Sequence, residues 1–282
     1  NRYIQFLKLR ASWGQLGNES VPASDGAYTT RVVTTTLGGI VYSGTVVSNS
    51  FSWLKWELVE ETNIGFTSRL LNDHLALDID YYRRDTKNAA IPVINPGVGN
   101  SVLKPVGVIR NSGIELEATW TNNISKDFNY SVSANFSTLK NQAVDLYGQT
   151  YIDGGSAEFR QRTYLNEPLM AFYGRKVAGV YQNQAEIDAD PIAVANGLVP
   201  GDFKYVDQNK DGKIDDDDRV ILGSYFPNIM YGGNINLNWK NLDFTLSFYG
   251  QAGNKVLNRK RGEIIWIPDG NLDAELAVNR WH

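Results

Sequence analysis

The chain has 282 residues, an apolar fraction of 42% and a formal net charge of −4. It contains no cysteine, which excludes a disulfide framework, a thiolate metal site and a cysteine nucleophile. The acidic balance and the lack of a basic cluster argue against nucleic acid as a partner. No run approaches the roughly 18 apolar residues of a membrane-spanning helix, so any membrane segment has to be a strand.

Alternation of apolar and polar residues marks the first strand and the first hairpin. Residues 6–14 (FLKLRASWG) place apolar side chains on one face and Lys8, Arg10 and Ser12 on the other. Residues 15–52 are rich in Gly, Ser, Thr and Val without a helical period, so we expect a long loop. Alternation returns around an Asn72-Asp73 break, which is a hairpin signal. The prolines in residues 83–107 predict another long loop.

Two further hairpins follow, over residues 113–138 and 230–250. The first turns at residues 122–127 and the second at Lys240-Asn241, and each has one apolar and one polar face. Glu115 and Glu117 share the polar face of their strand. We interpret them as pore-lining residues rather than as a catalytic carboxylate pair.

The layout of the turns decides between two fold classes. An alternating hairpin suits either a cover over a soluble core or two strands of a membrane barrel. Here the short turns lie at one end and the long connections at the other, with Trp13, Trp120 and Trp239 near strand ends. This pattern predicts an all-β, antiparallel transmembrane β-barrel with long extracellular loops. About seven strands are too few to close it, so we expect the C-terminal strands of the intact protein to lie outside this chain.

Residues 141–229 are predicted to form a large extracellular loop region that folds on itself. Residues 171–182 suggest an extra strand or hairpin outside the membrane band. Residues 184–195 suggest a short helix interrupted by Pro191.

A segment within this region follows the spacing of a calcium loop, with Gly212 at the position of the sharp turn. Its oxygen ligands would come from Asp207, Asn209, Asp211, Lys213 (through its carbonyl), Asp215 and Asp218. Position twelve is Asp rather than the usual bidentate Glu, and strand-like sequence flanks the loop. Residues 207–218 are therefore either one isolated Ca²⁺ clip or a solvated acidic turn.

No enzyme is predicted from the remaining polar residues. His74 and His282 are the only histidines, and neither has a metal or triad partner nearby in the sequence. The glycine pairs Gly38-Gly39 and Gly154-Gly155 do not stand between a strand and a helix, so phosphate binding is unsupported.

Several blocks of the sequence resemble the SusC/RagA family of TonB-linked outer-membrane transporters. They include LKLRASWGQLGN (7–18), LNDHLALDIDYYRRDTKN (71–88), IRNSGIELEATW (109–120) and the stretch from PGDFKYVDQNKDGKIDDDD to NKV (200–256). The blocks occur in the family's order over nearly the whole of residues 1–282. The resemblance implies the later half of a 22-stranded barrel in the outer membrane. The plug domain, the TonB-binding segment and the final strands would then lie outside this chain.

The resemblance also implies partners. Such transporters import oligosaccharide or oligopeptide cargo, driven through TonB, beneath a SusD-like surface lipoprotein, and the pairs can assemble as dimers. Residues proposed to contact cargo or lipoprotein are the loop aromatics Tyr42, Trp53, Tyr147, Tyr151, Phe159, Tyr164 and Trp266. Alternatives are a passive porin or a secreted β-rich carbohydrate-binding module with a calcium loop.

Overall fold

The computed structural model describes residues 3–19, 28–49, 55–94, 101–156, 159–259 and 274–278. The chain divides into two compact units. Unit 1 comprises Asn1–Asp153, Thr163–Leu169 and Phe226–Gly253. Unit 2 comprises Gly154–Arg162, Met170–Tyr225 and Asn254–His282.

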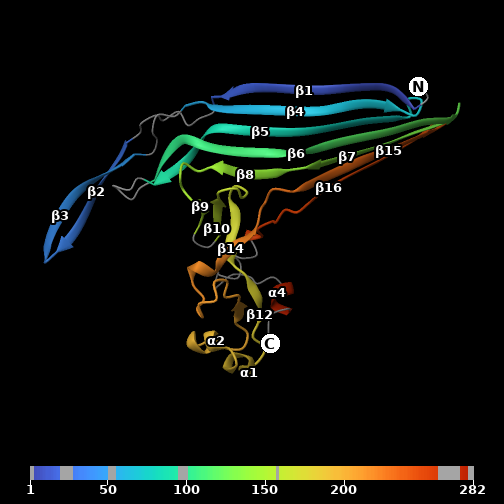
Figure 1. Cartoon of the computed structure of the whole chain (residues 1–282). Helices are drawn as coiled ribbons and strands as arrows, with labels where there is room; N and C mark the ends of the chain where they lie inside the picture. The colour runs from blue at the N-terminus through green and yellow to red at the C-terminus, as the bar shows by residue number, and fades with distance from the viewer. Residues whose placement is uncertain are drawn as a thin grey trace. The chain divides into compact units, whose positions relative to one another are not determined.

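Unit 1 is built on one long antiparallel sheet (Figure 1). Its strand order is β1-β4-β5-β6-β7-β15-β16, and β8 also pairs with β6. The strands are β1 (Ile4–Asn18), β4 (Glu57–Leu70), β5 (Leu75–Ile94), β6 (Ser101–Ser125), β7 (Phe128–Thr138), β8 (Lys140–Asp145), β15 (Ile229–Trp239) and β16 (Leu242–Ala252). The seven strands of the main path agree with the number predicted from alternation. The all-β prediction is confirmed.

Two of the three tight turns fall where the sequence predicts them. The turn predicted at residues 122–127 is shorter, because β6 continues to Ser125 and pairs Asn122 with Tyr130. Leu71, Asn72 and Asp73 have φ near +60°, and Lys240 has a φ of 53°. Leu70 pairs with Leu75, Trp239 pairs with Leu242, and Lys126-Asp127 joins β6 to β7. The turns lie at one end of the sheet in Figure 1, and the long connections leave from the other.

Two regions predicted as loops contain strands instead. Within residues 15–52, β2 (Tyr28–Leu37) and β3 (Ile40–Asn49) form a hairpin that turns at Gly38-Gly39. The Thr- and Val-rich sequence suits extended backbone, although it lacks a clear apolar-polar period. Residues 83–107 are also largely paired, because β5 continues to Ile94 and β6 begins at Ser101.

A register shift explains why alternation fails in this second region. Pairing slips between Lys87 and Ala89, and the intervening Asn88 has a φ of 56°, as in a β-bulge. Beyond the bulge, Ile91 and Val93 are buried in a cluster with Ala143 and Leu146. Val106, Ile152 and Leu169 pack around this cluster.

The remaining strands and helices are short. A second sheet has the order β14-β11-β10-β9 and a third joins β12 to β13. Their bounds are β9 (Tyr151–Gly155), β10 (Arg160–Tyr164), β11 (Ala171–Arg175), β12 (Val177–Val180), β13 (Phe203–Tyr205) and β14 (Arg219–Gly223). The helices are α1 (Gln184–Asp188), α2 (Pro191–Ala195), α4 (Ala274–Val278) and the 3₁₀ turn η1 (Asp216–Asp218).

Pro191 divides the predicted helix into two. It is the first residue of α2, a position where its missing N–H costs nothing, and the Asp190 side chain caps that helix. Tyr181, Ile187 and Ala193 form the small buried core beneath α1 and α2. In the described ranges, none of the helices combines the length and apolarity that a membrane-spanning helix needs.

Candidate functional site

The main sheet has one apolar and one polar face, and the strand register aligns each into rows. One apolar row runs Leu9, Phe66, Ile79, Leu116 and Phe136 across five neighbouring strands. These apolar side chains do not form a buried core. Exposed members of this face include Leu7, Leu9, Trp13, Ile64, Ile114, Phe136, Trp239, Phe244, Leu246 and Phe248. So large an exposed apolar surface implies a hydrophobic partner.

The polar face carries charged residues at its centre. The Arg10 guanidinium lies 2.8 Å from Asp78 Oδ1 and 2.5 Å from Asp80 Oδ2, and it also donates to Thr67 Oγ1. Glu115 pairs with Asp80 in the register, and Glu117 pairs with Asp78. Two open cavities of about 620 and 300 Å³ share Asp80 and Glu115 in their linings. The two glutamates therefore belong to a larger polar wall.

Amide and hydroxyl side chains continue the polar face over the last strands. Asn236 donates to Ser131 at 3.2 Å, and Asn238 donates to Asn129 at 2.7 Å. Thr245 in turn donates to Asn236 at 3.0 Å. These bonds satisfy the side chains across the sheet while leaving them accessible from the polar side.

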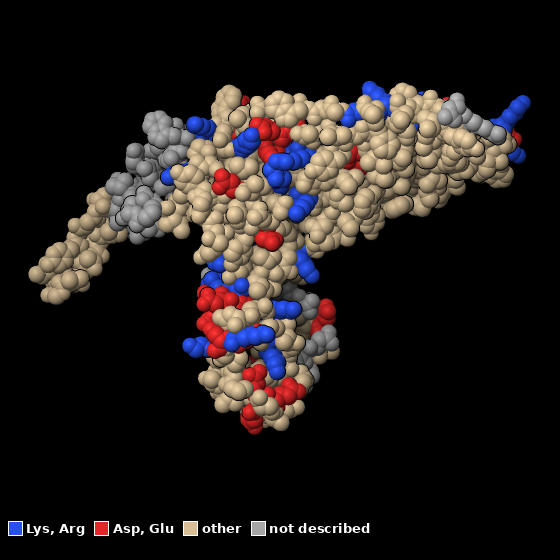
Figure 2. All heavy atoms as spheres, viewed as in Figure 1, with Lys and Arg blue, Asp and Glu red and all other residues tan. Residues whose placement is uncertain are grey.

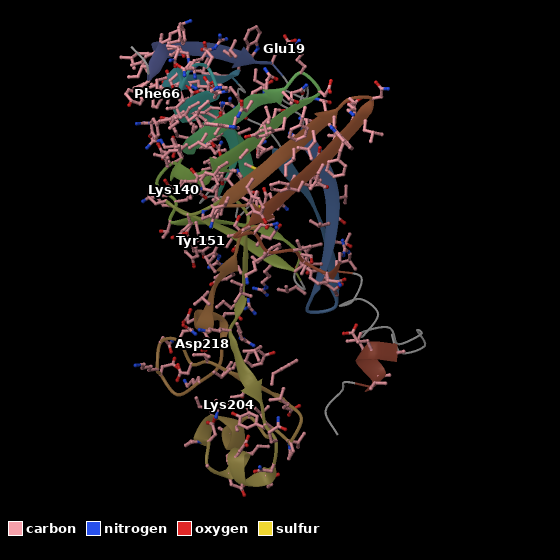
Figure 3. The ribbon with its side chains drawn as sticks, turned by 90° about the vertical axis from the view of Figure 1, so that its right-hand side faces the viewer. Glu19, Phe66, Lys140, Tyr151, Lys204 and Asp218 are labelled. Atoms are coloured by element: carbon pink, nitrogen blue, oxygen red, sulfur yellow. The ribbon has the colours of Figure 1, made fainter. Side chains whose placement is uncertain are left out.

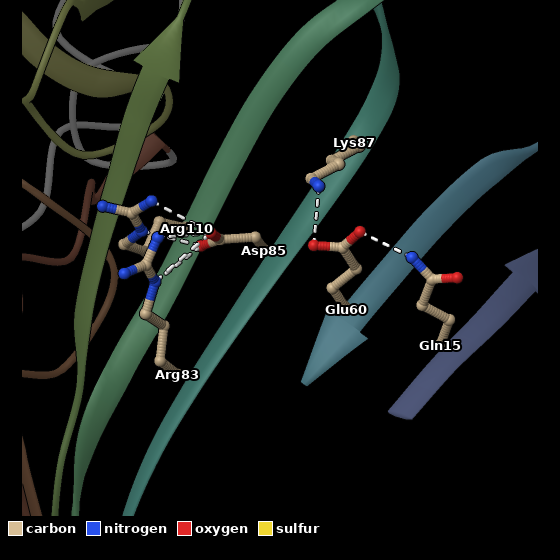
Figure 4. A network of polar contacts seen from close by, with 6 residues as sticks. All are labelled: Gln15, Glu60, Arg83, Asp85, Lys87 and Arg110. Atoms are coloured by element: carbon tan, nitrogen blue, oxygen red, sulfur yellow. Dashed lines mark hydrogen bonds and ion pairs between the residues drawn. The ribbon is translucent and has the colours of Figure 1, made fainter. Parts of the chain in front are cut away.

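Towards the long connections, several positions that share a side with the apolar face carry charged residues or glutamine. We call Gln15, Glu60, Arg83, Asp85, Lys87, Arg110 and Lys140 the ionic belt. Figure 4 shows Lys87 and Gln15 both bound to Glu60, and Arg83 and Arg110 both bound to Asp85. Figure 2 shows a cluster of charged side chains beside a broad uncharged expanse over the sheet. The belt was not predicted from the sequence, although charged residues occupy apolar-face positions within residues 83–87.

The calcium-like segment is a self-bonded loop. Asp207 accepts the backbone N–H groups of Lys210 at 2.6 Å and of Gly212 at 2.9 Å, and Asp211 accepts that of Lys213. Gly212 has a φ of 83°, which suits the sharp turn expected there. Among the described residues, no three carboxylate or histidine groups converge as metal ligands do. Calcium binding by residues 207–218 stays a prediction.

Asp218 is the buried anchor of this segment. Its carboxylate accepts the backbone N–H groups of Asp215 and Gln208, each at 2.8 Å. These bonds lower the pKa of Asp218 below its ordinary value. Nearby, burial raises the pKa of Tyr181 to about 12, and its hydroxyl donates to Asp190 at 2.6 Å. Asp218 and Asp190 thus hold their segments in place as ionised hydrogen-bond acceptors.

The proposed aromatic contacts are dispersed. Tyr42 on β3 and Tyr147 after β8 are more than half exposed, and Lys104 lies over the Tyr147 ring. The Tyr151 and Tyr164 rings meet edge to face at 5.6 Å. Phe159 lines a cavity of about 610 Å³ in unit 2, together with Phe172, Tyr205 and Arg219. Trp53 and Trp266 lie outside the described residues.

His74 has a structural role. Its ring stacks on Trp120 at 5.7 Å, and Nδ1 lies 2.8 Å from the carbonyl oxygen of Thr121. Trp120 donates its indole N–H to Tyr130. These aromatic residues lie towards the short-turn end of the apolar face. His282 lies outside the described residues.

Comparisons with known proteins agree with the two-faced sheet. The family model described as "TonB dependent receptor-like, beta-barrel" matches residues 2–254. The chain is 34% identical to TonB-dependent receptor P26 of Formosa agariphila, over 98% of this chain and 28% of the relative. It is 25% identical to TonB-dependent receptor SusC of Bacteroides thetaiotaomicron, over 89% of this chain and 25% of the relative. The chain thus spans about a quarter of the length of these relatives.

Among solved structures, the chain resembles the RagAB peptide transporter, with a TM-score of 0.72 and 22% identity. That match covers 100% of this chain and 31% of the other. The RagAB peptide importer in its "open-open" state also matches, with a TM-score of 0.68 and 21% identity. At this level of identity, the likeness concerns the fold.

Proposed function

Because the chain belongs to the TonB-dependent receptor-like β-barrel family, we propose that it forms part of the wall of a transporter that imports an oligosaccharide or oligopeptide. Family membership assigns it to the outer membrane and to a group of receptors and transporters, not enzymes. In the proposal, each long strand of the sheet crosses the bilayer, and TonB supplies energy through a part of the protein beyond this sequence.

The observation that carries this proposal is the sorting of side chains by face. Apolar rows with many exposed members suit lipid, whereas Arg10, Asp78, Asp80 and the asparagines of β15 suit water. From Leu70 to Thr62 the apolar face spans about 27 Å along the strand, at roughly 3.4 Å per residue. At a strand tilt of about 40° this length projects to about 21 Å, most of the roughly 25 Å apolar band of a membrane barrel.

We also propose a SusD-like lipoprotein as the partner on the side of the long connections. The resemblance to SusC and to the RagAB peptide transporter supports this assignment. Tyr42, Tyr147, Tyr151, Phe159 and Tyr164, together with Trp53 and Trp266, are proposed to contact cargo or lipoprotein. Exposed aromatic rings stack on sugars and anchor protein interfaces.

The test uses the full-length protein in its own outer membrane. Affinity purification in detergent should recover a surface lipoprotein, identified by mass spectrometry. Cells should accumulate labelled oligosaccharide or oligopeptide only when both the transporter and TonB are present. Uptake that persists without TonB would indicate a passive porin. Recovery of the protein in the soluble fraction without detergent would instead indicate a secreted binding module.

A further inference from the structure

The ionic belt lies where the apolar face ends, at the side of the long connections. Proceeding along that face, the row Ala11, Ile64, Tyr81, Ile114 and Thr138 is followed by Trp13, Thr62, Arg83, Ser112 and Lys140. The next row is Gln15, Glu60, Asp85, Arg110 and Gln142. The change from apolar to ionic side chains thus occurs at the same level on neighbouring strands.

The direction of these side chains follows from burial and register. On β8, Asn141 and Ala143 are buried, so the alternating Lys140 and Gln142 face the opposite side, and Lys140 is exposed. Asn141 donates to Asn111, which fixes both on the polar side. Phe66 and Lys140 are both labelled in Figure 3, on the same side of the sheet.

The belt carries more positive than negative charge. It has four cations, Arg83, Lys87, Arg110 and Lys140, against the two carboxylates of Glu60 and Asp85. Arg110 and Arg83 both hold Asp85, at 2.6 and 2.8 Å, and Lys87 holds Glu60 at 2.6 Å. Within the described part of the chain, Lys140 makes no ion pair. The Arg83 side chain is 46% exposed despite its ion pair with Asp85.

The row at the edge of the apolar face has the form of an anion site. Arg83 and Lys140 flank Ser112 in the register, so their Cα atoms lie about 10 Å apart, two strand spacings. Both side chains are long enough to converge over the serine hydroxyl. A phosphate group accepts charge-assisted hydrogen bonds from such a trio. Apolar residues directly beside it would hold the chains of a lipid.

We propose that the ionic belt, through Arg83, Ser112 and Lys140, binds the phosphate-bearing headgroup of a lipid in the outer leaflet. This inference rests on the proposed membrane orientation, in which the long connections are extracellular. With four cations against two carboxylates, the belt has a surplus of two positive charges. At the edge of a lipid-facing surface, this surplus matches an anionic headgroup whose acyl chains lie along Tyr81 and Ile114. Asp85 holds Arg83 and Arg110 in place, and Glu60 holds Lys87.

The experiment measures lipid binding to the full-length transporter, purified in mild detergent and stripped of lipid. Native mass spectrometry would follow titration with phosphatidylglycerol, with a neutral glycolipid of the same acyl chains, and with inorganic phosphate. The double variant R83Q/K140Q should bind phosphatidylglycerol about tenfold more weakly. The variant K126Q/K240Q removes two cations at the short turns and should bind as the wild type does.

Three outcomes would overturn the proposal. They are equal binding by R83Q/K140Q and wild type, equal losses in both double variants, and competition by inorganic phosphate at the concentrations effective for the lipid. If R83Q/K140Q fails to fold, K140Q alone carries the test, and the charge-preserving R83K/K140R should bind normally. Cargo uptake and lipoprotein recovery are measured in parallel, because they report on the proposed transport function independently of lipid binding.

Discussion

Asp218 organises the acidic segment 207–218 through its backbone contacts. Its carboxylate closes a capping box with Asp215 at η1 and also reaches back to the N–H of Gln208. Since these bonds favour the ionised form, the pKa of Asp218 lies below its ordinary value. The stabilisation provided by the Asp218 carboxylate is therefore fully present at a pH above its ordinary pKa. It is lost as the pH falls through the lowered pKa.

We predict that replacing Asp218 with Asn removes this acid sensitivity. Protection of the Asp215 and Gln208 amides should be weaker in D218N at neutral pH and should change less on acidification. Hydrogen exchange with mass spectrometry, corrected for intrinsic rates, measures this effect. D217N is the matched control, because Asp217 is exposed. Equal acid profiles for wild type and D218N would contradict the prediction.

Calcium binding is a second prediction for these residues. The carboxylates of Asp207, Asp211 and Asp215 accept backbone N–H groups and keep further lone pairs with which they could bind Ca²⁺. Isothermal titration of the full-length protein should show binding at or below millimolar Ca²⁺, weakened in D211N/D215N. The absence of heat at millimolar Ca²⁺ would leave the solvated acidic turn as the correct interpretation.

At the scale of strands, the spacing of β4 and β5 depends on one glycine. A Cβ atom at Gly65 would lie 2.1 Å from Asp80 Oδ1 and 2.4 Å from the carbonyl oxygen of Ile79. Asp80 is also a partner of Arg10. Glycine therefore makes room for the central ion pairs of the polar face.

Replacing Gly65 with Ala should displace Asp80 and destabilise the barrel by about 1 to 3 kcal/mol, the usual cost of overpacking. The control is G14A, because a Cβ at Gly14, on the neighbouring strand, meets nothing within 4 Å. Urea unfolding of the two variants in lipid vesicles gives the comparison. A G65A protein as stable as G14A would show that the strands can separate to admit the methyl group.

A lysine should destabilise the protein by different amounts on the two faces of β16. Leu246 belongs to the exposed apolar face, whereas the adjacent Thr245 donates to Asn236 on the polar face. L246K should cost about 2 to 4 kcal/mol of stability in a bilayer if it lies near the midplane, and T245K should cost clearly less. Folding yield and urea midpoints in vesicles measure both. Equal effects would mean that β16 does not separate lipid from water.

At the scale of the whole molecule, the sorting of turns and long connections predicts an orientation. Asp217 is exposed in the acidic segment, and Asp127 is exposed in the short turn between β6 and β7. In the full-length protein without other cysteines, a bulky maleimide should label D217C on intact cells. It should label D127C only after the outer membrane is opened. Labelling of D127C on intact cells would reverse the orientation.

The sequence by itself determined the position of those strands that have one apolar and one polar face. Alternation through Leu7 to Trp13, Leu75 to Tyr81 and Phe244 to Phe248 depends only on the two-residue period of a strand, so it can be read locally. The Asn72-Asp73 turn was predictable locally, since Asn and Asp tolerate the positive φ that both adopt. The Lys240-Asn241 turn was predictable as a polar break between two alternating runs. Glu115 and Glu117 were assigned to the polar face in the same way.

Tertiary structure decided what depends on register and distant pairing. The bulge at Asn88 shifts the apolar-polar alternation of β5, so the strand beyond it could not be read from the sequence. Ile91 and Val93 are buried there by contact with Ala143 and Leu146. Similarly, Arg83 and Lys140 are 57 positions apart and become neighbours of Ser112 only through the pairing of β5 and β8 with β6. A local pattern specifies the face of a residue, but hydrogen-bonded register specifies its neighbours on that face.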